Sequence, residues 1–198
     1  MKQIVLQKDE KKVIPVLLES DDRHSELGSE SRSRNEFGMT AKRIDVVLAG
    51  ENSSIEVFGL VLGNQTDEKS LEVFITHAAP NTKSNVNVRA VLKGKSRFDF
   101  RGNVKIENGA KGADAYLRSD TLLFDDAKMG DDTPALEILE KDVKAGHAAT
   151  VGKVDEGMLF YLMSRGITRK SAEKLLVEGF VEPILGRLRT KDDGLKHE

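Results

Sequence analysis

Cysteine is absent from the 198-residue chain, as is tryptophan. Disulfide bonds, zinc ribbons and cysteine-ligated iron–sulfur clusters are therefore excluded within this chain. No run of about 18 apolar residues occurs, and the N-terminus lacks the apolar core of a signal peptide. The formal net charge is only −2, which gives no reason to expect nucleic acid or an anionic membrane as a partner. These absences favour a cytoplasmic protein.

Motifs that carry nucleotide or hydrolytic chemistry are missing as well. The chain contains no GxxxxGK[ST] phosphate loop, no GxGxxG between a strand and a helix, no HExxH and no GxSxG. We therefore expect no nucleotide site in this chain. A histidine-based site remains open, because His, Asp and Glu from distant segments can be brought together by a fold.

Most of the sequence predicts β-structure. Residues 1–18 predict two short strands, 19–38 predict a polar mobile loop that contains His24, and 43–151 predict short strands separated by Gly, Asn and Asp. No amphipathic helix separates the strands, which argues against a doubly wound α/β fold. A sandwich, a barrel and a solenoid remain open.

Even spacing favours the solenoid among these folds. Apolar strand centres at Val57, Val73 and Val88 recur about 15 residues apart, and turn residues occupy the corners between them. A Greek key would need longer excursions between strands. The regular spacing therefore indicates stacked coils.

The periodicity changes to a helical one after Gly152. Asp155 is suited to N-cap a helix that Gly166 ends in left-handed geometry. The apolar stripe of this helix, which we interpret as core, comprises Met158, Leu159, Leu162 and Met163.

A second helix is predicted from Thr168, its N-cap, to Gly179, with Ala172, Leu175 and Leu176 on one face. Residues 181–188 predict a last short helix. The domain division is thus a core at 1–152, a helical subdomain at 153–190 and a frayed tail at 191–198. The helices resemble a helix-turn-helix, but 151–198 contain nine basic and eight acidic residues, which disfavours DNA binding.

Two histidines and two acidic pairs are the candidates for chemistry. His77 ends a predicted strand, which favours a corner residue that hydrogen-bonds the backbone. The small neighbours of His147 leave room for a ligand or for close approach of another strand or subunit. Asp125–Asp126 and Asp131–Asp132 are interpreted as solvated turn residues, because neighbouring residues on a strand face opposite ways.

The sequence also contains a set of motifs in a defined order. It comprises HAAPNTKS, GKSRFDFRG, LLFDDA, PALEI, HAATVG and LFYLMSRGI. Together they make residues 70–190, and more weakly the strands from 43, resemble the SufB/SufD family, the scaffold proteins of SUF iron–sulfur cluster assembly.

The resemblance implies a mainly β fold: a right-handed parallel β-helix followed by a C-terminal helical subdomain. It implies a scaffold rather than an enzyme, with a SufC-type ABC ATPase as partner and a homodimer or a heterodimer with a SufB-like subunit formed through late strands. Stable cofactors are not implied, and iron or an iron–sulfur cluster would be held only transiently. No nucleic-acid or membrane partner is implied.

Site residues follow from the resemblance position by position. His147 matches a histidine implicated in cluster or metal handling, and His77 is a second candidate for that role. Ser119 stands where the SufB branch has a cysteine, while Ala145 and Ala148 stand where relatives carry a cysteine and a glutamate. ATPase docking is assigned to the helical subdomain, with these candidates: Phe160, Tyr161, Arg165, Leu175, Leu176 and Phe180.

Three alternatives remain beside the scaffold. The chain could be a self-associating structural or regulatory β-helix module that has lost cluster chemistry, as the missing cysteines suggest. It could be a metal-dependent enzyme that uses His147 and nearby carboxylates. The helix pair could also serve only to cap an open end of the solenoid, which requires cover.

Overall fold

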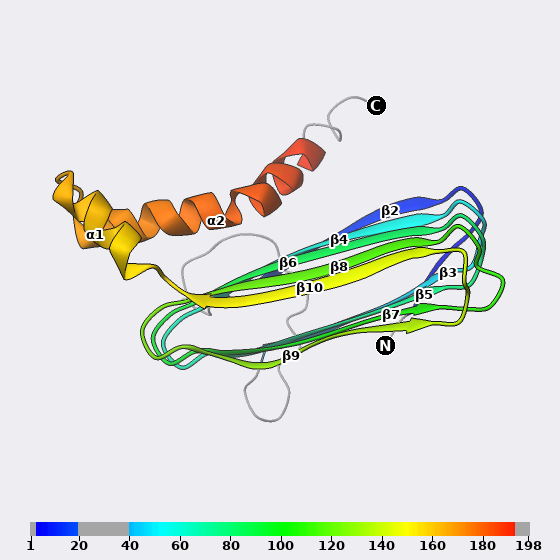
Figure 1. Ribbon diagram of the computed structural model, residues 1–198, viewed down its shortest axis with the longest axis horizontal. Coiled ribbons are helices and arrows are strands. Elements are labelled where there is room, and N and C mark those ends of the chain that lie inside the picture. Colours follow the sequence, from blue (N-terminus) through cyan, green and yellow to red (C-terminus); the bar gives the residue numbers. More distant parts are fainter. Residues whose placement is uncertain (1–2, 20–39, 193–198) are drawn as a thin grey trace.

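The computed structural model describes residues 3–19 and 40–192, and it shows two stacked parallel sheets with a helical arm (Figure 1). One sheet, called sheet A, contains strands β1 (Ile4–Leu6), β3 (Thr40–Leu48), β5 (Glu68–His77), β7 (Arg97–Ile106) and β9 (Lys128–Ile138) in that order. The other, sheet B, contains β2 (Lys11–Leu18), β4 (Ser54–Gly63), β6 (Lys83–Leu92), β8 (Asp114–Leu123) and β10 (Lys144–Lys153).

Successive strands alternate between the sheets, so the chain winds as a solenoid with two strands per coil. Ser54 pairs with Lys83, Lys83 with Asp114 and Asp114 with Lys144, which makes consecutive coils 29, 31 and 30 residues long. All pairings are parallel. The predicted parallel β-helix is therefore confirmed, and the strand spacing of about 15 residues is half of one coil.

The core lies between the sheets and is built from columns of equivalent side chains. Val57, Val86 and Leu117 are register partners on β4, β6 and β8, and all three are fully buried. Each such side chain contributes about 1.5–3 kcal/mol of transfer free energy. Because side chains alternate along a strand, one residue of slippage would turn every column toward solvent.

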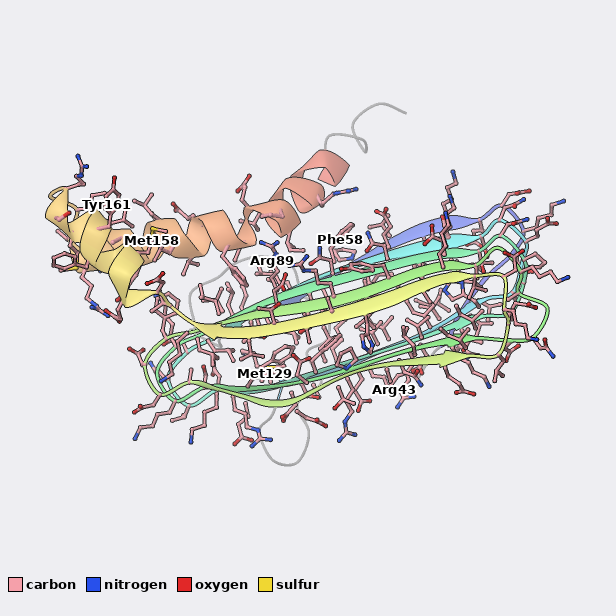
Figure 2. All side chains as sticks on the ribbon, in the orientation of Figure 1. Arg43, Phe58, Arg89, Met129, Met158 and Tyr161 are labelled. Atoms are coloured by element: carbon pink, nitrogen blue, oxygen red, sulfur yellow. The ribbon has the colours of Figure 1, made fainter. Side chains whose placement is uncertain are left out.

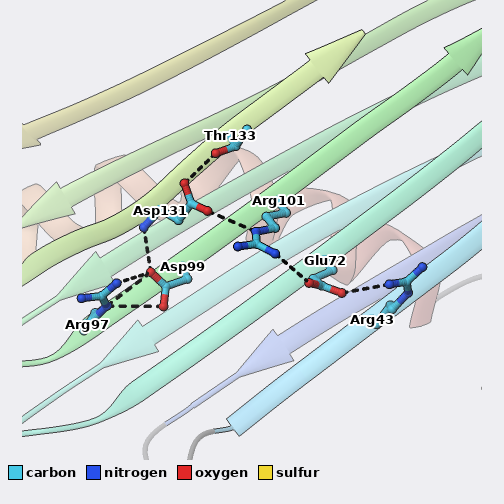
Figure 3. A network of polar contacts seen from close by, with 7 residues as sticks. All are labelled: Arg43, Glu72, Arg97, Asp99, Arg101, Asp131 and Thr133. Atoms are coloured by element: carbon cyan, nitrogen blue, oxygen red, sulfur yellow. Dashed lines mark hydrogen bonds and ion pairs between the residues drawn. The ribbon is translucent and has the colours of Figure 1, made fainter. Parts of the chain in front are cut away.

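The outer face of sheet A is covered by a ladder of ion pairs (Figure 3). Arg43 lies 3.3 Å from Glu72, Arg101 lies 3.9 Å from Glu72 and 3.1 Å from Asp131, and the Asp131 amide donates to Asp99. A hollow of about 520 Å³ lies over this ladder. Because the arginines that line this hollow are paired with carboxylates, we assign no ligand to the hollow.

Part of the outer face of sheet B is covered by α2 (Arg169–Asp192), which follows α1 (Glu156–Ser164) and contacts β4 and β6. A second apolar cluster joins α2 to this face, and Figure 2 shows Phe58 and Arg89 pointing from the sheet toward the helix. Its fully or nearly buried members are Phe58, Leu60, Val91, Phe124, Val181 and Ile184.

The helical region differs from the prediction in two ways. Helix α2 does not end at Gly179 but continues through Pro183, so no separate last helix exists. A glycine costs a helix about 1 kcal/mol, and burial of Val181 and Ile184 against sheet B outweighs that cost. The capping interpretation is also wrong, because α2 contacts β4 and β6 on the outer face rather than an open end.

Other helical details match the sequence-based expectation. The Asp155 carboxylate accepts hydrogen bonds from the amides of Gly157 and Met158, which confirms it as the N-cap of α1. Gly166 has a φ of +84°, a left-handed conformation that glycine adopts without strain. Thr168 accepts from the Ser171 amide, as the N-cap of α2 should.

Both ends of the solenoid are uncovered within the described residues. Strands β1 and β2 form one end, β9 and β10 the other, and each is the last strand of its sheet. Proline interrupts two of these strands, at Pro15 and Pro134, as is typical of edge strands. The late strands β9 and β10 are thus edge strands of their sheets.

The described ranges contain no helix long and apolar enough to span a membrane. The predicted strands within 1–18 are confirmed as β1 and β2. The loop predicted at 19–38 and His24 lie outside the described residues, apart from Glu19 at its start.

Gly102→Ala tests the tightness of the core. A β-carbon there would clash with the Leu117 side chain from the opposite sheet, so we expect a loss of about 1–3 kcal/mol in the free energy of unfolding. Gly152→Ala is the matched control, since nothing lies within 4 Å of its added carbon. Urea titrations of both variants make the comparison, and equal stability of the two would contradict this packing.

Candidate functional site

The candidate site lies at the uncovered end formed by β9 and β10, which we call the terminal coil. Strand β10 pairs with β8 along its whole length, and β9 pairs with β7. No further strand stacks on either within the described part of the chain. Inward-facing side chains of this coil are therefore accessible from one side, unlike those of every interior coil.

His147 is one of these inward-facing residues. It is in register with Leu117, which is fully buried in the core, so both positions lie on the same face of sheet B. His147 is nevertheless exposed, because the coil that would cover it is absent from the described residues. Its neighbours Gly146 and Ala148 are small, which leaves the imidazole accessible.

Ser119 lies on β8, the strand next to β10 in sheet B, and faces inward like His147. It is paired with Ala149, two residues from His147, and is fully buried. Its hydroxyl has no hydrogen-bond partner that meets normal geometry among the described residues. The fold thus places Ser119 and His147 near each other on neighbouring strands of the same inner face.

Asp132 was missed by the sequence analysis, which interpreted it as a solvated turn residue, and this was wrong. A bulge in β9 pairs Phe98 with Met129 but Phe100 with Asp132, so one extra residue is inserted. Asp132 therefore faces inward opposite the buried Phe100. Both of its carboxylate oxygens are shielded from solvent and lack hydrogen-bond partners among the described residues.

Burial raises the pKa of the Asp132 carboxyl, and the nearby Ser119 hydroxyl opposes this change. The adjacent Asp131 behaves in the opposite way, because the Thr133 hydroxyl and the Arg101 guanidinium lower its pKa on the outer face. A carboxylate on each face of one strand thus has its own environment. No simple alternation pattern predicts which of the two lies inside, because the bulge decides it.

His77, the other histidine candidate, is separate from the terminal coil. It is fully buried at the end of β5, with Nδ1 2.8 Å from the Thr82 hydroxyl and Nε2 2.8 Å from the Ser84 hydroxyl. Burial lowers its pKa from 6.5 to about 4. His77 is thus a hydrogen-bonded corner residue, but the expected backbone partners are wrong, because both ring nitrogens pair with side-chain hydroxyls. The structure does not bring His77 together with His147.

The second candidate region is the helix pair, which carries exposed apolar side chains. Figure 2 shows Met158 and Tyr161 on α1, at the far end from the body of the sheets. Phe160 is 74% exposed, Tyr161 54% and Leu175 50%. The core interpretation of the α1 stripe is therefore wrong for Met158 and Met163, which are exposed, but confirmed for Leu159, which is fully buried.

Polar contacts fix the two helices to each other. The Arg169 guanidinium makes two hydrogen bonds to the Glu156 carboxylate, of 2.8 and 3.0 Å, and a third of 3.0 Å to Glu173. Arg169 thereby lowers the pKa of Glu156. Arg165 stacks over the Tyr161 ring at 5.3 Å, so two docking candidates form one surface.

The remaining docking candidates are less accessible. Leu176 is half-buried, and Phe180 packs in the cluster between α2 and sheet B. The Phe180 carbonyl accepts a hydrogen bond from Arg89, whose guanidinium also lies 5.1 Å from the Phe180 ring. Phe180 thus holds α2 on the body, and we leave it out of the docking surface proposed below.

Comparison with known proteins supports the resemblance. The family model described as SUF system FeS cluster assembly, SufBD core domain, matches residues 30–180. An iron-sulfur cluster assembly SufBD family protein from Mycobacterium bovis is 38% identical over 170 residues, which cover 79% of this chain and 20% of that protein. The iron-sulfur cluster assembly protein SufB of Bacillus subtilis is 33% identical over 150 residues, covering 76% and 32%.

The stacked parallel coils and these matches define the chain as a β-solenoid protein that carries a SufBD core domain. The chain belongs to the SufBD family of the SUF system. It spans only a fifth to a third of the length of these curated relatives.

The donors at the terminal coil do not fit a thiolate-bound cluster. The chain has no cysteine, and iron–sulfur clusters are held mainly by thiolates. The described residues also contain no group of three or more His, Asp or Glu side chains arranged to hold a metal ion. What the terminal coil offers is an imidazole, a hydroxyl and a carboxylate.

The low pKa of His77 predicts acid destabilisation. Between pH 6.5 and about 4 the unfolded chain binds a proton at His77 and the folded chain does not, so stability falls as the pH decreases. The expected slope is about 1.4 kcal/mol per pH unit. His77→Leu should remove this component from urea titrations at several pH values. His147→Leu, at an exposed histidine, is the control and should keep it; an unchanged slope in His77→Leu would refute the assignment.

Proposed function

We propose that this chain is a SufB/SufD-like scaffold component of iron–sulfur cluster assembly that docks a SufC-type ABC ATPase through its C-terminal helices. The observation that supports this proposal is that one part of the helical arm packs on sheet B while the other part is exposed. Val181 and Ile184 anchor α2 to sheet B, while α1 and the first half of α2 leave Phe160, Tyr161 and Leu175 exposed. Large exposed apolar side chains grouped on one element mark an interaction surface.

The chemistry of this surface suits a groove-type interface. Aromatic and arginine side chains are the residues that most often dominate binding energy, and Tyr161, Phe160 and Arg165 supply them on α1. The Arg169–Glu156 pair joins α1 to α2 and favours one orientation of these side chains. An apolar helix face laid into a groove of the partner is the binding mode expected.

In this proposal the chain itself is not an enzyme. ATP is hydrolysed by the partner, which is consistent with the lack of phosphate-binding motifs in the sequence. We place the process in the cytoplasm, where a soluble ATPase has access to ATP. The terminal coil is the proposed place for handling of iron or cluster, with His147 as its accessible ligand.

Phe160→Glu and Leu175→Glu test the docking surface. Each introduces a charge where an apolar side chain would be buried by the ATPase, so we expect the Kd for the purified SufC-type ATPase of the same host to rise at least tenfold, or about 1.4 kcal/mol. Isothermal titration calorimetry measures this change. Val5→Glu is the matched control, because Val5 is 46% exposed on β1, far from the helices in sequence.

The control should bind with the affinity of the original chain. Equal weakening by Val5→Glu would show a general effect of added charge rather than docking. Absence of ATPase binding by the unmodified chain would remove the docking proposal and favour the second candidate, a self-associating module.

Self-association has its own supporting observation. Exposed apolar residues lie on and beside the uncovered strands of the terminal coil: Ile138, Leu139 and Val151. Unpaired strand edges invite pairing with another chain. We therefore propose a homodimer, or a heterodimer with a SufB-like subunit, formed through β9 and β10.

Val151→Lys tests this pairing. A lysine on the edge strand disfavours strand addition, so the variant should be monomeric by light scattering at tens of micromolar where the original chain is dimeric. Val5→Lys places the same change on β1, at the opposite end, and should leave the dimer intact. A monomeric original chain would count against the proposal.

A further inference from the structure

The methionines of this chain lie in two contrasting environments. Five are present in the sequence, and the structure describes three of them. Met129 on β9 is partly buried against the core, and its sulfur accepts a hydrogen bond from the Thr121 hydroxyl at 3.6 Å. Met158 and Met163 both lie on α1, where they are 47% and 41% exposed. Two of the three described methionines are thus open to solvent on a single short helix.

Each exposed methionine lies about one helical turn from an aromatic residue of the proposed docking surface. Met158 precedes Tyr161 by three residues, and Met163 follows Phe160 by three. Residues three apart are neighbours on the surface of a helix, and Figure 2 shows Met158 and Tyr161 together on α1. A groove of the ATPase that covers Phe160 and Tyr161 would therefore cover the two methionines as well.

The thioether of methionine is the sulfur group that a peroxide can oxidise in this chain, because cysteine is absent. The sulfur attacks one oxygen of the peroxide, the O–O bond breaks and an S=O bond forms. With hydrogen peroxide the products are methionine sulfoxide and water, so the sulfur loses two electrons and the peroxide gains them. The reaction converts an apolar side chain into a polar one, and sulfoxide reductases reverse it.

We propose that Met158 and Met163 form an oxidative modification site, at which a peroxide weakens docking of the partner ATPase. A sulfoxide oxygen that is buried in an apolar groove without a hydrogen-bond donor costs free energy. The same oxygen costs nothing in the free chain, where water hydrates it. Oxidation therefore favours the undocked state. This inference rests on the proposed function, because it names a regulation of the same helical surface.

Exposure without any role in docking is the competing explanation. Under it, a peroxide would modify both α1 methionines and leave the affinity for the ATPase unchanged. Met129 is a control matched in residue type, because it lies on β9 and not on the helical arm. Leucine is the suitable replacement at all three positions, since it has a similar volume and no sulfur.

The first part of the experiment locates the oxidation. The purified chain is treated with hydrogen peroxide before any ATPase is added, and catalase then removes the remaining peroxide. Peptide mass spectrometry measures the sulfoxide fraction at each methionine over time. We expect Met158 and Met163 to be oxidised at least about fivefold faster than Met129, because oxidation follows exposure. Far-UV circular dichroism checks that the oxidised chain keeps its helices.

The second part measures the effect on docking. Calorimetry gives the Kd for the purified SufC-type ATPase of the same host before and after oxidation, and for the original chain we expect a rise of at least about tenfold. The double variant Met158→Leu/Met163→Leu should keep, after peroxide treatment, the Kd that it had before, whatever that value is. Met129→Leu retains both α1 methionines, so its Kd should rise as in the original chain. A methionine sulfoxide reductase should restore the affinity of the oxidised chain.

Three results would overturn the inference. They are an unchanged Kd after full oxidation of Met158 and Met163, an equal rise in the Kd of the double variant, or oxidation of Met129 as fast as that of the α1 methionines. If the double variant does not fold, protection decides instead. Bound ATPase should slow the oxidation of both α1 methionines in the original chain, and an unchanged rate would refute their place in the docking surface.

Failure of this inference can be told apart from failure of the proposed function. Lack of binding by the unoxidised chain removes the docking proposal, and the regulation falls with it. Normal binding before oxidation and equal binding afterwards removes only the regulation. The Kd of the unoxidised chain thus reports on docking, and the ratio of the two Kd values reports on the methionines.

Discussion

Register between parallel coils is the constraint on which the rest of this structure depends. Each inward side chain is covered by its equivalent one coil further on, as Val57, Val86 and Leu117 show. A parallel sheet buries both of its faces only if other elements cover its outer face as well. Here one outer face carries α2 and the other carries paired charges.

The same constraint creates the candidate site. A column of equivalent positions must stop at the terminal coil, and the residues there face inward without a covering neighbour in the described chain. His147 is accessible for this reason, although it continues a column of buried apolar side chains. Burying a polar side chain without a partner costs free energy. Polar residues at the end of a column avoid this cost because nothing in the described chain covers them.

The helical arm obeys a different constraint. Sequence periodicity within α1 and α2 locates apolar residues but does not say what will cover them. Helix α2 lies along the outer face of sheet B because its apolar side chains are buried against β4 and β6. Most of α1 is therefore exposed. This is why Met158 and Met163 of the predicted α1 stripe are exposed, and why Phe180 faces the body while Phe160 does not.

The sequence by itself determined the solenoid, the helical arm, the N-cap at Asp155 and the family, because these depend on local periodicity, capping chemistry and ordered motifs. Tertiary structure alone decided the continuity of α2 past Gly179, the hydroxyl partners of His77 and the inward position of Asp132. Each of these depends on how elements meet in the fold: sheet B against α2, the turn between β5 and β6 that places Thr82 and Ser84 at His77, and β7 against β9. A single inserted residue in β9 exchanges the two faces of the strand, and only the pairing of β9 with β7 shows where it lies.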